Sequence, residues 1–333
     1  MSADDFLTDD LLGLAPIDVA RALSGEQEDE DLAPVGETIW SSVDARTFYK
    51  EIRTHIEQGK LPKTRHNLPQ PFLSVSQVEL YLKCPKQYEF RYIKGIRSPP
   101  SVALVQGTTI HKAVEIGYQY VIDKGELPPV ELALDTFHDH YRENMSSDVI
   151  RQEHESDAFN YAYGEKLLTI WHKDKLPTVK PVMVEQQFIV PIYDIPVIGG
   201  IDLIDGAPHT EGATDNVVVD NKVVGKKYSQ NDVDSMLQMS LYSAAARLPN
   251  QRYDLFIKPN EDYLKNPNSK AKGPRIEPMK TIRTASDILW MARIFKEVAQ
   301  AISAGNFPPT SPTSWTCSAS WCGFWRACRG RQR

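Results

Sequence analysis

The sequence predicts an α/β protein in which a small mixed sheet is flanked by helices. Two observations support this prediction: amphipathic helical patterns dominate residues 72–175, and short β-branched runs alternate with helical runs after residue 180. This alternation is typical of folds in which helices cover a sheet. The 333 residues are 41% hydrophobic and 25% charged, which indicates a soluble globular chain with one large core.

The first 37 residues differ from the rest in charge. They hold eleven acids and one base, Arg21, and so carry −10, whereas the whole chain carries −6 and the remainder therefore +4. We interpret residues 1–37 as an acidic disordered tail. The alternative is that the apolar stretch 6–22 forms a helix on a protein partner that the tail recruits. Neither a signal peptide nor an apolar run long enough to span a bilayer is present, so we expect a cytoplasmic protein without membrane contact.

The expected elements follow in chain order. Residues 38–71 are predicted to form one helix (43–58) and a proline-punctuated linker. Ser76 and Glu79 have the spacing of a capping box, and the helix that they open should end at Cys84, because a proline follows. Further helices are expected at 88–93, 108–122, 135–144, 158–173, 231–246 and 285–304, and strands at 182–189, 197–204, 217–222, 253–257 and 276–282.

Two predicted strands carry acids. Asp202 follows Gly199-Gly200-Ile201, and Asp220 follows three valines. Strand alternation places Asp220 and Lys222 on the same face, where two charges are costly unless they are paired or bind a metal. One interpretation is a surface Asp–Lys pair. The other is a Mg²⁺ or Mn²⁺ site, where the lysine activates a metal-bound water and has a lowered pKa.

The order of the motifs resembles the PD-(D/E)XK nuclease superfamily in its RecB-like branch. The resemblance covers roughly residues 72–328 and rests on Ser74-Val75-Ser76, Cys84-Pro85, Gly107-x3-His111, Asp202, Asp220-x-Lys222 and Gln238-x3-Tyr242. It implies a restriction-endonuclease-like core over residues 72–328, with a helical insertion at about 108–175, a cluster-binding C-terminus and a basic tail at 329–333. Asn221 and Val223 replace the aromatic residue and the Thr or Ser that often flank the family's lysine, and Gly-Ile-Asp replaces Pro-Asp. These departures put the fine geometry of the site in question.

The resemblance also implies roles for individual residues. The metal ligands would be His111, Asp202, Asp220 and the backbone carbonyl of Asn221, with Lys222 as the catalytic lysine. Gln238 and Tyr242, four apart on one helical face, would orient the site or contact the DNA backbone. Glu185 is a further candidate ligand, although a surface acid is an equal alternative. Glu115 is a candidate partner for the second ring nitrogen of His111.

The four cysteines suggest a second metal centre. Cys317, Cys322 and Cys328 have the spacing Cys-x4-Cys-x5-Cys, and Cys84 lies 233 residues before the first of them. Disulfides are not expected in a cytoplasmic protein, and zinc usually binds tighter Cys-x2-Cys pairs. The family resemblance implies a structural [4Fe-4S] cluster that ties the end of the chain to its start, although the family more often has x2 in the first spacing. Zinc, or four unrelated buried thiols, are the alternatives.

The expected function is that of a Mg²⁺- or Mn²⁺-dependent deoxyribonuclease, an exonuclease rather than an endonuclease, acting on single strands or DNA ends. It is similar to CRISPR-associated RecB-like exonucleases and to the nuclease domains of helicase–nuclease complexes. It would serve recombination, repair, phage replication or spacer capture. The sequence has no helicase phosphate-binding motif, so a helicase, recombination or CRISPR-adaptation protein would be a partner. The alternative is a non-catalytic DNA-binding or assembly subunit that carries the cluster.

DNA contacts require basic side chains, which bind phosphates, and aromatic rings, which stack on nucleobases. The candidates are Lys83, Lys86, Arg91, Lys94, Lys226, Lys227, Lys265, Lys270, Lys272 and Arg275, together with Trp321, Phe324, Trp325, Arg326 and Arg329. The aromatic residues near the cysteines have packing as an equal alternative role. Motifs that read base sequence are absent, so little sequence specificity is expected.

Overall fold

The computed structural model describes residues 34–330 apart from 44, 146–148, 151–155, 207–215, 260–261, 264–265 and 267–271. The predicted disordered tail therefore lies almost entirely outside the described residues, as do Lys265 and Lys270. Within the described ranges, every helix is too short or too polar to span a lipid bilayer.

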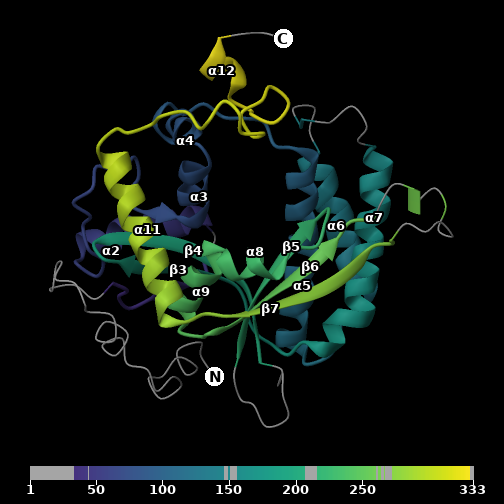
Figure 1. Cartoon of the computed structure of the whole chain (residues 1–333). Helices are drawn as coiled ribbons and strands as arrows, with labels where there is room; N and C mark the ends of the chain where they lie inside the picture. The colour runs from purple at the N-terminus through teal and green to yellow at the C-terminus, as the bar shows by residue number, and fades with distance from the viewer. Residues whose placement is uncertain are drawn as a thin grey trace.

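The core is a seven-stranded mixed sheet with the order β1-β3-β4-β5-β6-β7, and β2 pairs with β4 outside this path (Figure 1). The strands are β1 (Ile39–Ser41), β2 (Leu73–Ser74), β3 (Pro181–Ile192), β4 (Ile195–Asp205), β5 (Val217–Val224), β6 (Asn250–Ile257) and β7 (Arg275–Ile282). β5 and β6 are parallel and are joined by helices α8 (Gln230–Ser235) and α9 (Leu237–Ala246), because a parallel pair needs a crossover connection.

The mixed sheet flanked by helices is confirmed, but the expectation of a small sheet is wrong. β1 and β2 have three and two residues, which is too short to produce a period-2 pattern that sequence analysis can detect. β1 nevertheless pairs with β3. Helix α2 (Ala45–Glu57) also packs on the sheet, since Phe48 and Ile52 are buried in one cluster with Ile189.

Two groups of helices cover the two faces of the sheet (Figure 1). Helices α3 (Val75–Lys83), α9 and α11 (Ala285–Ser303) share one buried cluster with the sheet. Helices α5 (Val102–Lys124), α6 (Val130–Asn144) and α7 (Asp157–Ile170) share the second, which includes the turns η4 (Trp171–Lys175) and η5 (Leu176–Thr178). Because both faces are covered, a charged side chain on a central strand is costly unless a polar group or a cation offsets it.

Several helix boundaries differ from the sequence prediction, among them the start of α6, which lies at Val130 instead of residue 135. α3 is capped by Ser74, whose Oγ accepts from the Gln77 amide, and not by Ser76, because the helix begins directly at the end of β2. α5 begins at Val102, so Gly107 lies inside the helix rather than before it. The helix expected at 231–246 breaks at Met236, which has extended backbone. Thr284 and Asp287 form the predicted capping box of α11.

The C-terminal segment returns to helices α3 and α4, near the start of the chain's helical part. The backbone amide of Lys86, in α4 (Pro85–Tyr88), donates to the carbonyl of Pro308 at 3.2 Å, and the Tyr81 hydroxyl donates to that of Asn306 at 2.6 Å. Beyond α4, the π-helical turn η3 (Glu89–Ile93) places Phe90 against Phe324, with ring centroids 5.9 Å apart. Helix α12 (Trp325–Arg329) then ends the described chain above α4 (Figure 1).

Two glycines of α5 provide a matched test of how this helix packs on Trp171. A Cβ on Gly117 would approach the Trp171 ring to 2.4 Å, whereas a Cβ on Gly107 meets nothing within 4 Å. We expect Gly117→Ala to lower the free energy of unfolding by about 1–3 kcal/mol through overpacking. Gly107→Ala should raise it by about 1 kcal/mol, because alanine favours the helix. Denaturant melts of both variants check this, and equal stability of the two would contradict the packing of α5 on Trp171.

Candidate metal and catalytic site

The site lies where strands β4 and β5 separate. Their pairing covers three residue pairs and ends at Leu203 and Val219, so Asp202 and Asp220 are the next residues on the two strands. Beyond this point the Asn221 amide donates to Asp202 Oδ2 at 2.8 Å. The carboxylate thus accepts from an amide at the point where the β4–β5 ladder stops. The separation of the strands therefore fixes Asp202.

Glu185 joins Asp202 from the neighbouring strand β3. The pairs Val184–Leu203 and Gln186–Ile201 flank it, which places Glu185 opposite Asp202 in the register. Its backbone has φ 47°, a left-handed conformation that is costly for a residue with a side chain. Two like charges in this arrangement repel each other, so the position favours a bound cation between them.

His111 completes a group of potential ligands. Its Nδ1 lies 3.4 Å from Asp202 Oδ2. One ligand atom each of His111, Glu185 and Asp202 lie within 4.8 Å of one another, and no other group of three His, Cys, Asp or Glu side chains does so in the described part of the chain. Two carboxylates and an imidazole are a donor set that suits Mn²⁺ or Mg²⁺, so the residues fit a divalent cation.

The pKa values of the acids show the cost of this arrangement. Burial, with the charges of Asp202 and Glu115, raises the pKa of Glu185 to about 9. Burial and the charge of Asp220 raise the pKa of Asp202 to about 6, although His111 and Lys222 oppose this. The protein alone therefore does not balance the negative charges of Glu185 and Asp202. A bound divalent cation would supply the missing positive charge and lower both pKa values.

Asp220 and Lys222 form the second half of the site. Lys222 Nζ lies 3.0 Å from Asp220 Oδ2, and the carboxylate is 1% exposed while the lysine side chain is 32% exposed. The Gln238 amide donates to the Tyr242 hydroxyl at 2.6 Å, and that hydroxyl donates to Asp220 Oδ1 at 3.4 Å. Burial and the two aspartates raise the pKa of Tyr242 well above its usual value, so the phenol remains a donor.

The lowered pKa expected for Lys222 is not found. Burial by itself lowers it, but Asp220 and Asp202 act in the opposite direction and raise the pKa above the ordinary value of 10.5. The sequence argument considered the apolar strands around the lysine, whereas its two acidic neighbours dominate in the folded chain.

Two acids have roles that the sequence did not distinguish. Glu115, proposed as the partner of His111, instead forms an ion pair with Lys112, with Nζ 2.7 Å from Oε1. Glu79 was considered only as a helix-capping residue. Burial raises its pKa, and it interacts electrostatically with Lys222 and Asp220 from helix α3. No local pattern in the sequence indicates this, because only the packing of α3 on the sheet brings Glu79 near Lys222 and Asp220.

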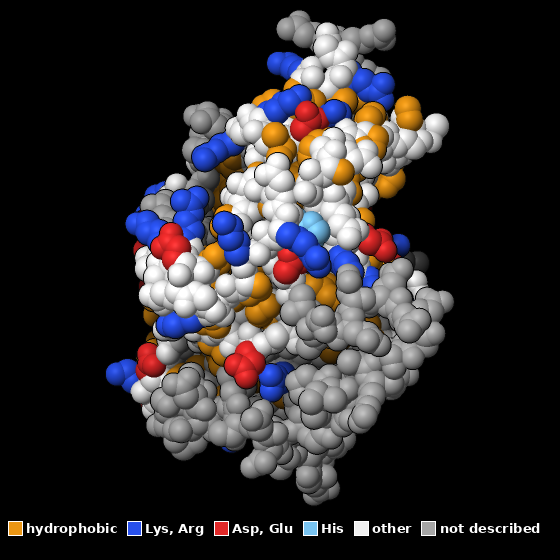
Figure 2. Space-filling view, turned by 90° about the vertical axis from the view of Figure 1, so that its left-hand side faces the viewer, with side chains coloured by type: hydrophobic (Ala, Val, Ile, Leu, Met, Phe, Trp, Pro, Cys, Tyr) orange, Lys and Arg blue, Asp and Glu red, His pale blue; other side chains and the backbone are white. Residues whose placement is uncertain are grey.

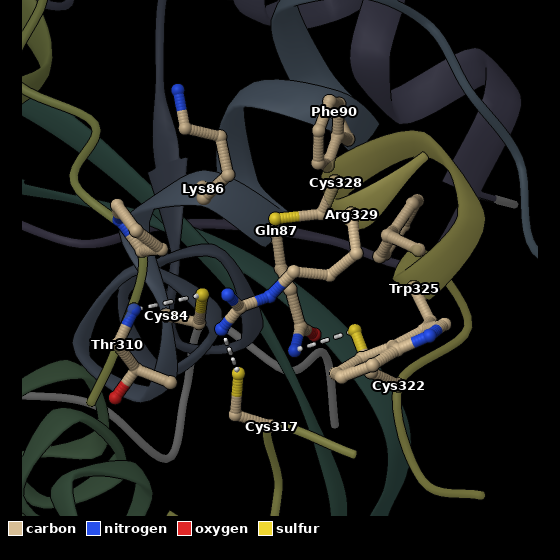
Figure 3. Close-up of a pocket in the computed structure, with 12 residues that line it drawn as sticks. Cys84, Lys86, Gln87, Phe90, Thr310, Cys317, Cys322, Trp325, Cys328 and Arg329 are labelled. Atoms are coloured by element: carbon tan, nitrogen blue, oxygen red, sulfur yellow. Dashed lines mark hydrogen bonds between the residues drawn. The ribbon is translucent and has the colours of Figure 1, made fainter. Parts of the chain in front are cut away.

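The four cysteines line one pocket between α4 and the C-terminal segment (Figure 3). Three of the sulfurs accept an N–H at 3.5 Å: Cys84 from the Thr310 amide, Cys322 from Gln87 Nε2 and Cys317 from Arg329 Nη2. No three of the four sulfurs lie within 4.8 Å of one another, since the only such ligand group in the described ranges is that of His111. The four thiols thus line the same pocket, but they do not form a compact ligand group.

The predicted DNA-contact residues divide into packed and exposed ones. Phe324 is 7% exposed and packs on Phe90, and Trp325 lies in the cysteine pocket under the Arg329 guanidinium. Both aromatic rings therefore have packing roles. Lys227 and Arg275 both form ion pairs with Glu277. Trp321, in contrast, is 61% exposed.

Comparisons with known proteins add the following. A family model described as "PD-(D/E)XK nuclease superfamily" matches residues 72–329. The Gene 69 protein of Mycobacterium phage L5 is 30% identical over 77 residues, which are 23% of this chain and 26% of that protein, so the chain matches only about a quarter of this relative. The solved structure of SSO0001 aligns with a TM-score of 0.34 at 11% identity, over 88% of this chain and 100% of that one. Candida albicans Rai1 in complex with pU5-Mn2+ aligns with a TM-score of 0.22 at 12% identity, over 70% of each chain. These two scores are too low to support an argument.

Glu185 and Glu115 provide a matched pair for testing the cation site. We expect Glu185→Gln to weaken Mn²⁺ binding at least about tenfold, because it removes a charged oxygen from the group around Asp202. Glu115→Gln should change the affinity much less, since Glu115 is paired with Lys112. Titration of Mn²⁺ followed by electron paramagnetic resonance measures both variants. Equal affinities would exclude Glu185 as a ligand.

Proposed function

The chain belongs to the PD-(D/E)XK nuclease superfamily, and we propose that it is a DNA exonuclease of the RecB-like, iron–sulfur branch that acts on single strands or DNA ends. The observation that carries the proposal is the convergence of His111, Glu185 and Asp202 beside the Asp220–Lys222 pair. A divalent-metal-dependent nuclease activity is what the family and this donor set support most directly.

A divalent cation bound here would polarise the phosphodiester and lower the pKa of a coordinated water. His111, Glu185, Asp202 and Asp220 would hold it. Lys222 remains protonated next to Asp220 and can donate to a phosphate oxygen, offsetting the negative charge that develops during hydrolysis. Tyr242, hydrogen-bonded to Gln238 and Asp220, holds the Asp220 carboxylate in place. The proposed role of the Asn221 carbonyl stays a prediction, since the hydrogen bond described for that residue comes from its amide.

We propose a [4Fe-4S] cluster as the occupant of the cysteine pocket. A tetrahedral zinc site with Zn–S bonds of about 2.3 Å needs its sulfurs within roughly 4 Å of each other. The four sulfurs line one pocket with wider spacing, which suits a larger centre better than a single ion. N–H donors to three of the sulfurs are the contacts that stabilise and tune thiolate ligands of such clusters. The cluster would join the C-terminal segment to α4.

The biological setting also remains a proposal. A nuclease of this branch would act in recombination, repair, phage replication or spacer capture, with a helicase or CRISPR-adaptation protein as partner and the acidic tail as a recruiting segment. The relative in a mycobacteriophage agrees with a phage setting, over the quarter of its length that matches. The alternative function is a non-catalytic DNA-binding or assembly subunit.

The activity is tested with oligonucleotides labelled at the 5′ or 3′ end, single- or double-stranded, in Mg²⁺ or Mn²⁺. We expect Asp220→Asn and Lys222→Ala each to reduce cleavage by at least about 10²-fold. The first removes a charged ligand of the cation, and the second removes the positive charge that offsets the negative charge developing on the phosphate. Lys124→Ala, an exposed lysine at the end of α5, is the matched control and should retain full activity. Unchanged cleavage by both site variants would refute the site, and no cleavage by the wild type would favour the non-catalytic alternative.

The cluster is tested by visible absorbance together with iron and acid-labile sulfide content of anaerobically purified protein. We expect Cys322→Ser to lose the absorbance and to lower the melting temperature, because the C-terminal segment then loses its link to α4. Ser320→Ala in the same loop should retain both properties. A wild-type protein that binds one zinc ion and no sulfide would instead identify the pocket as a zinc site.

A further inference from the structure

Two exposed tryptophans, Trp315 and Trp321, lie in the loop that carries Cys317 and Cys322. Trp315 is 70% exposed and Trp321 is 61% exposed, and their rings meet edge to face with centroids 5.5 Å apart. A large aromatic ring contributes most when it is buried, so two adjacent exposed indoles are an unfavourable arrangement in an isolated protein. Trp290 on α11 is also exposed, at 54%, but the described residues include no aromatic partner for it. The pair therefore calls for a functional explanation.

The backbone holds the pair in this position. The Cys317 amide donates to the Ser314 carbonyl at 2.8 Å, and the Cys322 amide donates to that of Ser318 at 2.9 Å. The Ser318 hydroxyl donates to the carbonyl of Trp315 itself at 3.1 Å. Phe324, packed on Phe90, and the side chains that line the cysteine pocket lie next to this loop. Exposure of the two indoles thus follows from a hydrogen-bonded loop whose interior is occupied.

The surface around the pair is basic. Residues 83–98 contain five lysines or arginines and residues 309–330 contain two, and the one acid of both segments is Glu89. Their combined charge is therefore +6, whereas the whole chain carries −6. The two segments are in contact, since a Cβ on Gly323 would meet Ser98 Oγ at 2.4 Å. Figure 2 shows Lys and Arg side chains gathered with apolar ones at this end of the molecule. A polyanion is the ligand that such a surface attracts.

Helix α3 connects this surface with the catalytic residues. Glu79 interacts with Lys222 and Asp220, and Lys83 follows four residues later, on the same face one turn further along. Cys84, which lines the cysteine pocket, is the next residue. A chain of phosphates that leaves the active site along α3 would meet Lys83 and then the basic surface within a few nucleotides.

We propose that Trp315 and Trp321 form a base-stacking platform for single-stranded DNA beside the nuclease site. Exposed aromatic rings in a basic groove bind single strands because unpaired bases offer their faces, whereas the bases of a duplex are already stacked. The platform would hold the unpaired strand while Lys222 and its neighbours act on the scissile phosphate. This inference rests on the proposed DNA substrate and adds a binding site to it, and it does not require the cysteine pocket to hold a cluster rather than zinc.

Binding is measured with the full-length protein in EDTA, using fluorescence anisotropy of a labelled oligo(dT), so that cleavage does not enter. We expect Trp321→Ala and Trp315→Ala each to weaken binding at least about fivefold, because each removes one stacking ring. Trp290→Ala is the matched control and should bind like the wild type. Trp321→Phe keeps a ring and should retain most of the affinity, which separates stacking from damage to the loop.

Unchanged affinity of the Trp315→Ala and Trp321→Ala variants would overturn the platform. Equal losses on blunt duplex DNA would overturn the assignment to single strands. Cleavage is assayed separately in Mn²⁺. If the wild type binds through the tryptophans but does not cleave, the proposed enzyme is refuted and the platform is supported. If the wild type cleaves and the tryptophan variants bind equally well, the platform is refuted and the proposed enzyme is supported.

Discussion

The separation of β4 and β5 beyond Leu203 and Val219 is the constraint on which the site depends. Helices cover both faces of the sheet and the Asp220 side chain is 1% exposed, so the charges of Asp202 and Asp220 are costly unless polar groups offset them. Where the strands separate, the Asn221 amide donates to the Asp202 carboxylate, and Lys222 pairs with Asp220. The polar chemistry of the protein is thus located at an interruption of its own sheet.

The charges gathered at this interruption are only partly balanced. Lys222 offsets Asp220, and His111 lies against Asp202, but the pKa of Glu185 is raised to about 9 by burial and by the neighbouring acids. The left-handed backbone of Glu185 adds a conformational cost at the same point. Local strain and repulsion of this kind are typical of binding sites, where the ligand and not the protein completes the electrostatics.

Helix α3 links the proposed catalytic residues with the cysteine-lined pocket. Its middle carries Glu79, which interacts with Lys222, and its end is Cys84. The Tyr81 hydroxyl, between these positions, donates to the carbonyl of Asn306 and so ties the helix to the returning C-terminal segment. The same short helix therefore contacts both the group around Asp220 and the segment that carries three of the cysteines.

The sequence by itself determined the helices and long strands, because their 3.6- and 2-residue periods are local, and the order of the motifs indicated Asp202, Asp220 and Lys222. It missed β1 and β2, which are too short to show a period, and placed the cap of α3 at Ser76 instead of Ser74. Only the tertiary structure decided that Glu185 lies with His111 and Asp202, that Glu115 pairs with Lys112, and that Lys222 has a raised pKa. It also decided that Trp321 is exposed while Phe324 is buried. Each of these outcomes depends on contacts between residues far apart in the chain, and no local pattern encodes which of two similar side chains such a contact selects.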